Sequence, residues 1–310
     1  MLSDESRRKL NEQLINCLLD DKIPSNIKLK KMNYIVCLGA DVDAEMDCSQ
    51  NSYPQYSVLG LAKAMREDKI ISFLEEKGAK NDISPTYDKL EYFFSLESVD
   101  RINDFLKMLP NGFVLDCNIS FGYKNFSELP DFSKVIVSGA FDCRKLGLHT
   151  LEGSPKEVWG NFECMGNKLK TLKGAPSIVK GNFDCTGNEI ISLEGAPLIV
   201  GGYFRCACNK LKTLENGPIE VTGSYICGNN ELVSLVGMPK MIKGDFDCHN
   251  NKITSLEGGP NEVVGNVDCS GNEIRSLIGA PVKIGGDFDY DVDSFEFCTI
   301  RKNLLSNSGK

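Results

Sequence analysis

Apolar and polar positions recur with a fixed period through the second half of the chain. Between Ala140 and Asp289 one short pattern returns every 21 residues. An apolar residue, usually Phe, stands two positions before each cysteine; Leu or Ile stands five after it, Leu eight after it and Pro twelve after it. The cysteines that mark the repeat are Cys143, Cys164, Cys185, Cys206, Cys227, Cys248 and Cys269. Seven returns of so many positions predict a repeat protein.

A single repeat is too short to fold alone. About five apolar side chains, at about 1.5 to 3 kcal/mol each, do not offset the ordering of the repeat at about 1 to 2 kcal/mol per residue. The repeats must therefore stack as a solenoid. In Phe183-Asp184-Cys185 the alternation places Phe and Cys on one face of a short strand and Asp on the other. We expect parallel strands about 4.8 Å apart, with Asn bonding neighbouring turns and Gly permitting a sharp corner before each strand.

The pattern Phe-x-Cys-x-x-Asn-x-Leu resembles the leucine-rich repeat, whose strand motif is Leu-x-Leu-x-x-Asn-x-Leu. Six of the seven repeats carry the Asn, at Asn167, Asn188, Asn209, Asn230, Asn251 and Asn272. The short, proline-bearing remainder is similar to repeats of bacterial effectors and phage-borne proteins. The resemblance covers about half of the chain. It implies a curved solenoid with strands on the concave side, and recognition as its task.

The N-terminal part has helical periodicity. Apolar residues at helical spacing predict one helix over Asp4–Leu19 and a second over Ile27–Cys37. The segments 57–62 and 70–79 resemble ankyrin repeats. They depart from that family in having Gly60 for His and Val58 for Pro, and in two Gly-Ala steps 39 residues apart where about 33 is usual. Residues 44–56 are then an enlarged loop, and an unrelated helical cap is the alternative.

The remaining segments complete an α+β architecture. Pro85–Leu109 has a further helical pattern, and Val114–Cys117 is predicted to be an irregular first strand. Phe288–Phe295 keeps the register as a modified last turn. We therefore expect a helical ankyrin-like domain over 1–112, a leucine-rich solenoid with a parallel concave sheet over 113–296, and a C-terminal cap and tail over 297–310.

Cysteine content and charge narrow the function classes. Of 13 cysteines, seven belong to the repeat, where they are expected to act as small buried apolar residues and not as disulfide or zinc ligands. The net charge is −8 with no basic patch, which disfavours direct nucleic-acid binding. The chain has no apolar run that could span a membrane. Its first residues lack the apolar core of a signal peptide, so a cytoplasmic location is expected.

Candidate catalytic chemistry is sparse. The only histidines are His149 and His249, and no nucleotide-binding or zinc-protease motif occurs. Asp287, Asp289, Asp291 and Asp293 resemble the start of a calcium loop, but its sixth and twelfth positions do not match. We expect no enzyme activity, cofactor or metal.

The polar strand position forms an acidic column. Across the turns it reads Asp142, Glu163, Asp184, Arg205, Ile226, Asp247, Asp268 and Asp289. Like charges on adjacent strands repel, so folding alone is expected to have no use for them. The column either steers a basic partner to the groove or only keeps the sheet soluble.

The interruption of this column indicates a binding patch. Tyr203, Arg205 and Ile226 combine an aromatic ring, a guanidinium and an aliphatic side chain, as in binding hot spots. His249 faces either solvent or a partner. Trp159 is either a second anchor or packs against the N-terminal domain.

These observations predict a non-enzymatic protein that binds a protein partner with a basic surface. The family resemblance implies an origin in a phage, an intracellular bacterium or a large virus, with a host or defence factor as partner. The alternative is an acidic nucleic-acid mimic that blocks a DNA- or RNA-binding protein. A cofactor-free enzyme is a third possibility.

Overall fold

The computed structural model describes residues 3–38, 40–45, 56–80, 82, 87–122 and 126–291. The chain divides into two compact units. Unit 1 comprises 1–146, 151–162 and 174–176, and unit 2 comprises 147–150, 163–173 and 177–310. The predicted C-terminal cap over 297–310 and most of the predicted loop over 44–56 lie outside the described residues.

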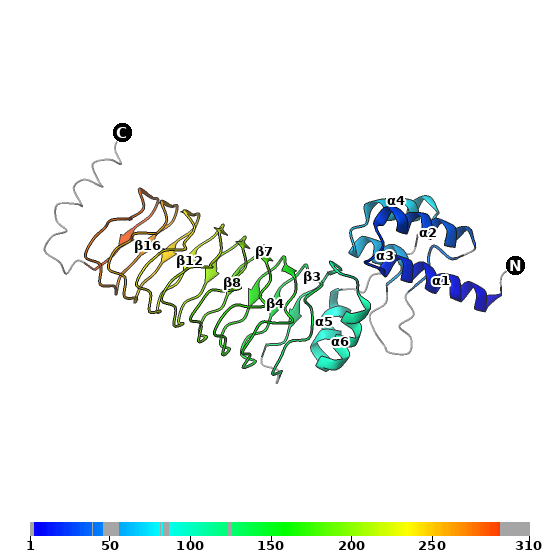
Figure 1. The fold of residues 1–310 in the computed structure, drawn as a ribbon, viewed down its shortest axis with the longest axis horizontal. Helices are drawn as coiled ribbons and strands as arrows, with labels where there is room; N and C mark the ends of the chain where they lie inside the picture. The colour runs from blue at the N-terminus through cyan, green and yellow to red at the C-terminus, as the bar shows by residue number, and fades with distance from the viewer. Residues whose placement is uncertain are drawn as a thin grey trace. The chain divides into compact units, whose positions relative to one another are not determined.

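Six helices lie in the described part of unit 1 (Figure 1). The predicted first helix is confirmed, and serine side chains at Ser3, Ser57 and Ser98 accept backbone N–H groups at the starts of three helices. The single helical pattern predicted over Pro85–Leu109 forms two helices, because Ser98 begins a new one. No helix in the described ranges has the length and apolar character needed to cross a bilayer. The helices are α1 (Asp4–Leu19), α2 (Ser25–Cys37), α3 (Val58–Ala64), α4 (Asp68–Glu76), α5 (Tyr87–Leu96) and α6 (Val99–Met108).

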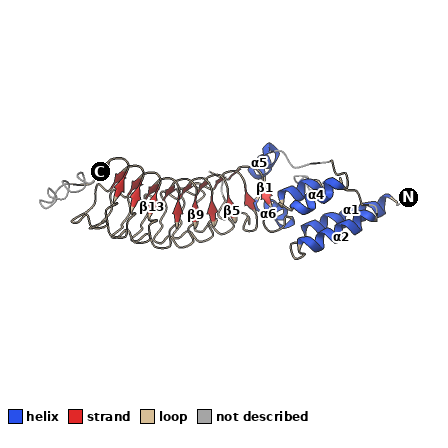
Figure 2. Ribbon diagram, turned by 90° about the horizontal axis from the view of Figure 1, so that it is seen from above, coloured by secondary structure: helices blue, strands red, loops and turns tan. Residues whose placement is uncertain are grey.

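Each complete turn of the repeats contributes two short strands, one more than the sequence predicted (Figure 2). The even-numbered strands form a nine-stranded parallel sheet in the order β18-β16-β14-β12-β10-β8-β6-β4-β2. They are β2 (Ile119–Ser120), β4 (Phe141–Asp142), β6 (Phe162–Glu163), β8 (Phe183–Asp184), β10 (Phe204–Arg205), β12 (Tyr225–Ile226), β14 (Phe246–Asp247), β16 (Val267–Asp268) and β18 (Phe288–Asp289). The predicted layout, N-terminal helices followed by a parallel-sheet solenoid of about eight turns, is confirmed.

The odd-numbered strands lie at the apolar position that follows each proline. They form two further parallel sheets, in the orders β1-β3-β5-β7-β9-β11 and β13-β15-β17. They are β1 (Val114–Leu115), β3 (Ile136–Val137), β5 (Glu157–Val158), β7 (Ile178–Val179), β9 (Ile199–Val200), β11 (Glu220–Val221), β13 (Met241–Ile242), β15 (Glu262–Val263) and β17 (Lys283–Ile284).

Equivalent side chains stack from turn to turn inside the solenoid. Phe204 is in register with Phe183 on one side and Tyr225 on the other, and all three side chains are buried. The seven repeat cysteines are 0 % exposed and carry free thiols. Burial raises the pKa of the thiols of Cys185, Cys206 and Cys227 above the ordinary value, so they stay neutral. The prediction that these cysteines act as buried apolar residues is confirmed.

Buried asparagines join successive turns. The Nδ2 of Asn209 donates to the carbonyl oxygens of Cys206 and Cys185, each at 3.1 Å, and its Oδ1 accepts from Ile190 N at 3.0 Å. The same pattern of bonds recurs in unit 2 at Asn188, Asn230, Asn251 and Asn272. Each amide therefore satisfies backbone groups in two turns that the strands leave unpaired.

The glycine before each even-numbered strand has a different role from the predicted sharp corner. At Gly223 the backbone does not need a positive φ, but a Cβ would lie 2.7 Å from Gly202 C and 2.8 Å from Tyr203 N. Close approach of the preceding turn is thus what excludes a side chain.

A buried hydroxyl gives the first testable prediction. Tyr225 stands where most turns have Phe; it is 0 % exposed, and its hydroxyl has no hydrogen-bond partner among the described residues. An unpaired buried polar group costs about 1 to 3 kcal/mol. Tyr225→Phe is therefore expected to raise the free energy of unfolding by about 1 kcal/mol, measured by urea denaturation. An unchanged or lower stability would show that the hydroxyl is paired.

Candidate functional site

The candidate site is the strand face, defined as the outward side chains of the even-numbered strands in unit 2 and of the one or two residues that flank each strand. Strand pairing places Asp184, Arg205, Ile226, Asp247, Asp268 and Asp289 in register on successive turns. Glu163 precedes them on β6, and Asp142 occupies the equivalent position in unit 1. The predicted acidic column thus exists as a row of neighbouring side chains.

The aspartates of this column have a local folding role that sequence reasoning missed. Asp184, Asp247 and Asp268 each accept the backbone N–H two residues further on, from Thr186 at 2.9 Å, His249 at 3.0 Å and Ser270 at 3.0 Å. Asp184 is only 6 % exposed. The expectation that folding has no use for these residues is therefore wrong, because the carboxylates satisfy N–H groups at the ends of the strands.

Asp142 in unit 1 behaves in the same way. It accepts the backbone N–H of Arg144 at 3.0 Å and also bonds the guanidinium, with Nε at 2.9 Å and Nη2 at 2.8 Å. Burial by itself raises the pKa of Asp142, but the hydrogen bonds from Arg144 outweigh it and hold the pKa below its ordinary value. This carboxylate is neutralised within its own turn.

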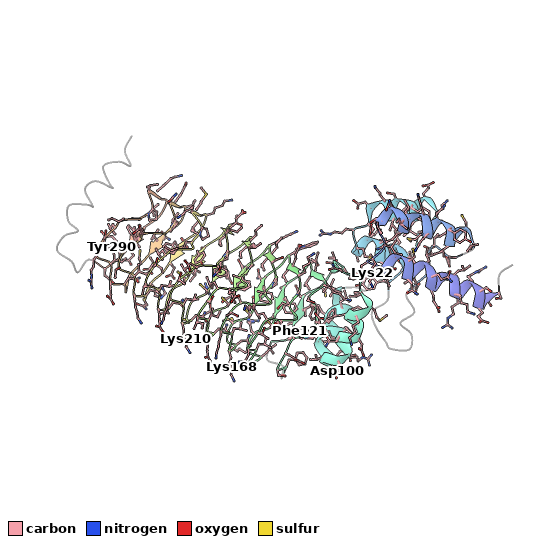
Figure 3. All side chains as sticks on the ribbon, viewed as in Figure 1. Lys22, Asp100, Phe121, Lys168, Lys210 and Tyr290 are labelled. Atoms are coloured by element: carbon pink, nitrogen blue, oxygen red, sulfur yellow. The ribbon has the colours of Figure 1, made fainter. Side chains whose placement is uncertain are left out.

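Folding does not by itself require that the strand-face residues of unit 2 be negatively charged. A different column, at another edge of the same turns (Figure 3), alternates between positive and negative side chains. In it Lys210 pairs with Glu189 and Lys252 pairs with Glu231, each at 3.4 Å. A strand-end N–H needs an acceptor but not a charge, so Asn or Ser would serve as well. The strand face repeats negative charge on neighbouring turns, whereas the alternating column balances each negative side chain with a positive one. The alternating column is Lys168, Glu189, Lys210, Glu231, Lys252 and Glu273.

A second polar column on the same face links the turns. Asn182 accepts from Tyr203 N at 2.9 Å, Ser224 from Asp245 N at 3.0 Å, and Asp245 from Asn266 N at 2.8 Å. Tyr203 occupies this column, but its side chain makes no hydrogen bond to the next turn among the described residues. The aromatic ring therefore stands where the other residues of this column accept a hydrogen bond from the next turn.

Tyr203, Arg205 and Ile226 lie together as predicted. The Arg205 guanidinium carbon is 5.1 Å from the centre of the Tyr203 ring, and Arg205 Nη1 is 3.9 Å from Asp184 Oδ2. Ile226 is half-buried and is flanked by Arg205 and Asp247 on the neighbouring strands. Partial burial, with Asp184 nearby, raises the pKa of Tyr203 above its ordinary value. The cluster is an ordered surface in which the guanidinium is already positioned.

Trp159 belongs to a contact within unit 1. The guanidinium carbon of Arg66, from the segment between α3 and α4, lies 4.0 Å from the centre of the indole ring. The indole Nε1 donates to Glu157 Oε2 at 3.4 Å. This geometry favours packing against the helical part over the alternative of a partner anchor.

His249 is held on both sides of its ring. Its Nδ1 donates to Asp247 Oδ1 at 2.5 Å, and its Nε2 accepts from Asn229 Nδ2 at 2.7 Å. It is therefore an ordered residue of the strand face, with 29 % of its side chain exposed.

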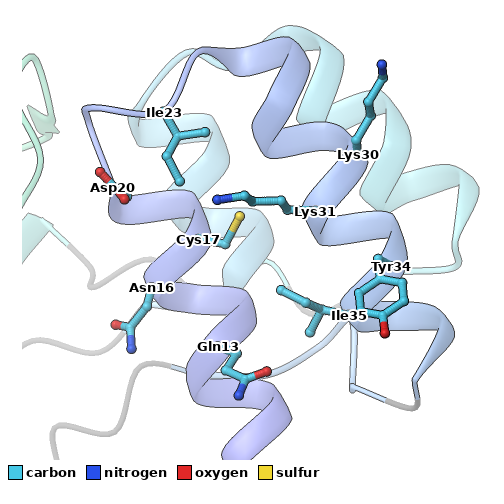
Figure 4. A pocket seen from close by; sticks show the side chains of 9 residues that line it. All are labelled: Gln13, Asn16, Cys17, Asp20, Ile23, Lys30, Lys31, Tyr34 and Ile35. Carbon is cyan, nitrogen blue, oxygen red and sulfur yellow. The ribbon is translucent and has the colours of Figure 1, made fainter.

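Unit 1 contains a groove that the sequence did not indicate (Figure 4). It has a volume of about 600 Å³ and lies between α1 and α2. Cys17, Ile23 and Ile35 provide apolar lining, and Lys30 and Tyr34 are among the polar residues around it. No motif marks such a groove, because it arises from the packing of two helices.

No family model, curated protein or solved structure matches the chain. The choice of site therefore depends on the geometry of the strand face. Its two features are the run of like charge and the cluster of three residues that interrupts it.

Proposed function

We propose that the chain is a non-enzymatic recognition protein that binds a protein partner through Tyr203, Arg205 and Ile226. The acidic residues on either side, from Glu163 to Asp289, select a partner with a basic surface. In this proposal the repeats are leucine-rich repeats whose strand face is concave, and α1–α4 are degenerate ankyrin-like units. The chain acts in the cytoplasm of its own cell or of a host, where its partner is a host or defence factor.

One observation carries the proposal. Strand-face side chains in unit 2 commonly accept a hydrogen bond that closes a strand end or joins two turns, as at Asp184 and Asp245. A guanidinium and an aliphatic side chain cannot accept such bonds. Within the described part of the chain, the Tyr203 side chain does not accept a hydrogen bond from the next turn either. Tyr203, Arg205 and Ile226 therefore do not make the structural hydrogen bonds that other residues make at these positions. Their residue types are those enriched in binding hot spots.

The leucine-rich assignment has support of its own. The buried Asn of the motif bonds the backbone of two turns, as predicted from the repeat pattern, and the Phe and Cys positions fill the interior. Neither feature identifies a partner.

A nucleic-acid mimic is the second candidate function. The carboxylates of Asp247, Asp268 and Asp289, on neighbouring turns, favour the mimic, because they form a row of negative charge with no alternating cation. Such a row would occupy the basic surface of a DNA- or RNA-binding protein.

A capture experiment distinguishes these functions. Partners are recovered from the native cell with the wild-type chain, with a Tyr203→Ala, Arg205→Ala, Ile226→Ala triple variant, and with a matched Lys168→Ala, Lys210→Ala, Lys252→Ala variant at the other edge. We expect the first variant to lose the partner at every salt concentration and the second to keep it.

The recovered complex is then titrated with salt. Hot-spot binding predicts a modest salt dependence, whereas mimicry predicts affinity that falls steeply as salt rises. Recovery of the same partners by the wild type and the Tyr203 triple variant would refute the proposed patch.

A further inference from the structure

Three side chains of the strand face bring metal-binding atoms together. Asp247, His249 and Asp268 each provide one ligand atom, and these atoms all lie within 4.8 Å of one another. Asp247 and His249 point to the same side of one turn, and Asp268 is in register with Asp247 on the next. Two carboxylates and an imidazole from two turns therefore converge on one point.

The neighbouring turn is shaped around the imidazole. A Cβ at position 228 would overlap His249 Cε1 and Nδ1, so Gly228 leaves the space that the ring occupies. The Asn229 amide contacts Nε2 at 2.7 Å and is itself held by Asn250, whose Nδ2 donates to Asn229 Oδ1 at 3.1 Å. The ring is thus fixed from behind, with Nδ1 directed toward Asp247.

The charge at this place is uncompensated within the described residues. Asp247 has an ion-pair contact only with His249, and Asp268 bonds only within its own turn, to Ser270 N and Oγ. Asp289 adds a further carboxylate in register with Asp268. No lysine or arginine of the described ranges forms an ion pair with these three aspartates.

We propose that Asp247, His249 and Asp268 bind a divalent transition-metal ion of the Zn²⁺ type. Mixed imidazole and carboxylate donors suit such ions, and three protein ligands leave a fourth position for water. His249 binds the ion through Nδ1 as the neutral tautomer, so its single ring proton moves from Nδ1 to Nε2. Asn229, with its amide turned over, then accepts a hydrogen bond from Nε2–H and keeps the ring oriented. The site shares Asp247 and Asp268 with the acidic residues of the proposed function, but it includes none of Tyr203, Arg205 and Ile226.

Calorimetric titration of the untagged full-length chain with Zn²⁺ tests the site. We expect His249→Ala and Asp268→Asn to weaken this binding event at least about 10-fold. Asn229→Ala, which removes only the support of the ring, is expected to weaken it by about 10-fold. His149→Ala and Asp245→Asn are matched controls, because both residues are exposed and lie outside the cluster; they should bind as the wild type does.

Titration with Co²⁺ separates this site from the thiols. Binding through oxygen and nitrogen predicts ligand-field bands without thiolate charge-transfer bands, and these ligand-field bands should be lost in His249→Ala. Far-UV circular dichroism establishes that each variant is folded. The proposal is overturned by no uptake at millimolar Zn²⁺, by unchanged affinity in folded His249→Ala, or by a Co²⁺ spectrum due only to thiolates.

Discussion

Replacing Asn209 with alanine is expected to lower the free energy of unfolding by about 1 to 3 kcal/mol. The buried amide accepts from Ile190 N and donates to three carbonyl oxygens in two turns, those of Cys185, Cys206 and Ala207. Each carbonyl keeps a second donor, but alanine leaves Ile190 N without a partner in the interior, which costs about 1 to 3 kcal/mol. Urea denaturation followed by circular dichroism measures the change.

The neighbouring residue provides the control for this prediction. Lys210 is exposed and pairs only with Glu189 across the turns, so Lys210→Ala should change stability by less than about 0.5 kcal/mol. Asn209→Asp keeps the shape but loses the donor, and is expected to destabilise as strongly as alanine. A loss below about 1 kcal/mol for Asn209→Ala would mean that the buried asparagines do not hold the turns together.

Phe204→Ala is expected to have a comparable or larger effect, about 3 to 5 kcal/mol. The ring is 0 % exposed, is stacked on Phe183 at a centroid distance of 5.5 Å, and lies 5.2 Å from Tyr225. Its removal leaves a cavity between two turns whose strands are held in register by their backbones, so the site cannot collapse fully. Thermal and urea unfolding give the magnitude.

The adjacent residue distinguishes packing from binding. Tyr203 is on the strand face, so Tyr203→Ala should cost less than about 1 kcal/mol of stability while it removes the proposed partner contact. If Tyr203→Ala destabilised the chain as much as Phe204→Ala, the ring would be a structural element and the binding cluster would lose its basis.

The period of the chain predicted much of the fold. The fixed positions of Phe, Cys and Asn could be satisfied together only by turns that stack in register, and the structure buries these positions as expected. The helices were also predictable from apolar spacing, but the break at Ser98 depended on a cap. The second strand of each turn was missed because it has a single inward residue, such as Val200, whereas Phe-x-Cys shows two inward residues in alternation.

The strand-face aspartates show where reasoning from one repeat fails. A column of like charge suggested a surface with no folding role, yet Asp184, Asp247 and Asp268 each accept a backbone N–H. That bond depends on how the chain turns after the strand. Residue type and spacing alone do not contain this information.

By itself the sequence determined the repeat length, the inward and outward residues, and the order of helices and solenoid, because burial must follow the spacing of apolar side chains along the chain. Only the tertiary structure decided which side chains from different turns meet. His249 rests in the space left by Gly228 and faces Asp268, and Arg205 lies over Tyr203 beside Asp184. Such contacts depend on rotamers and on the close approach of neighbouring backbones, which no single repeat specifies.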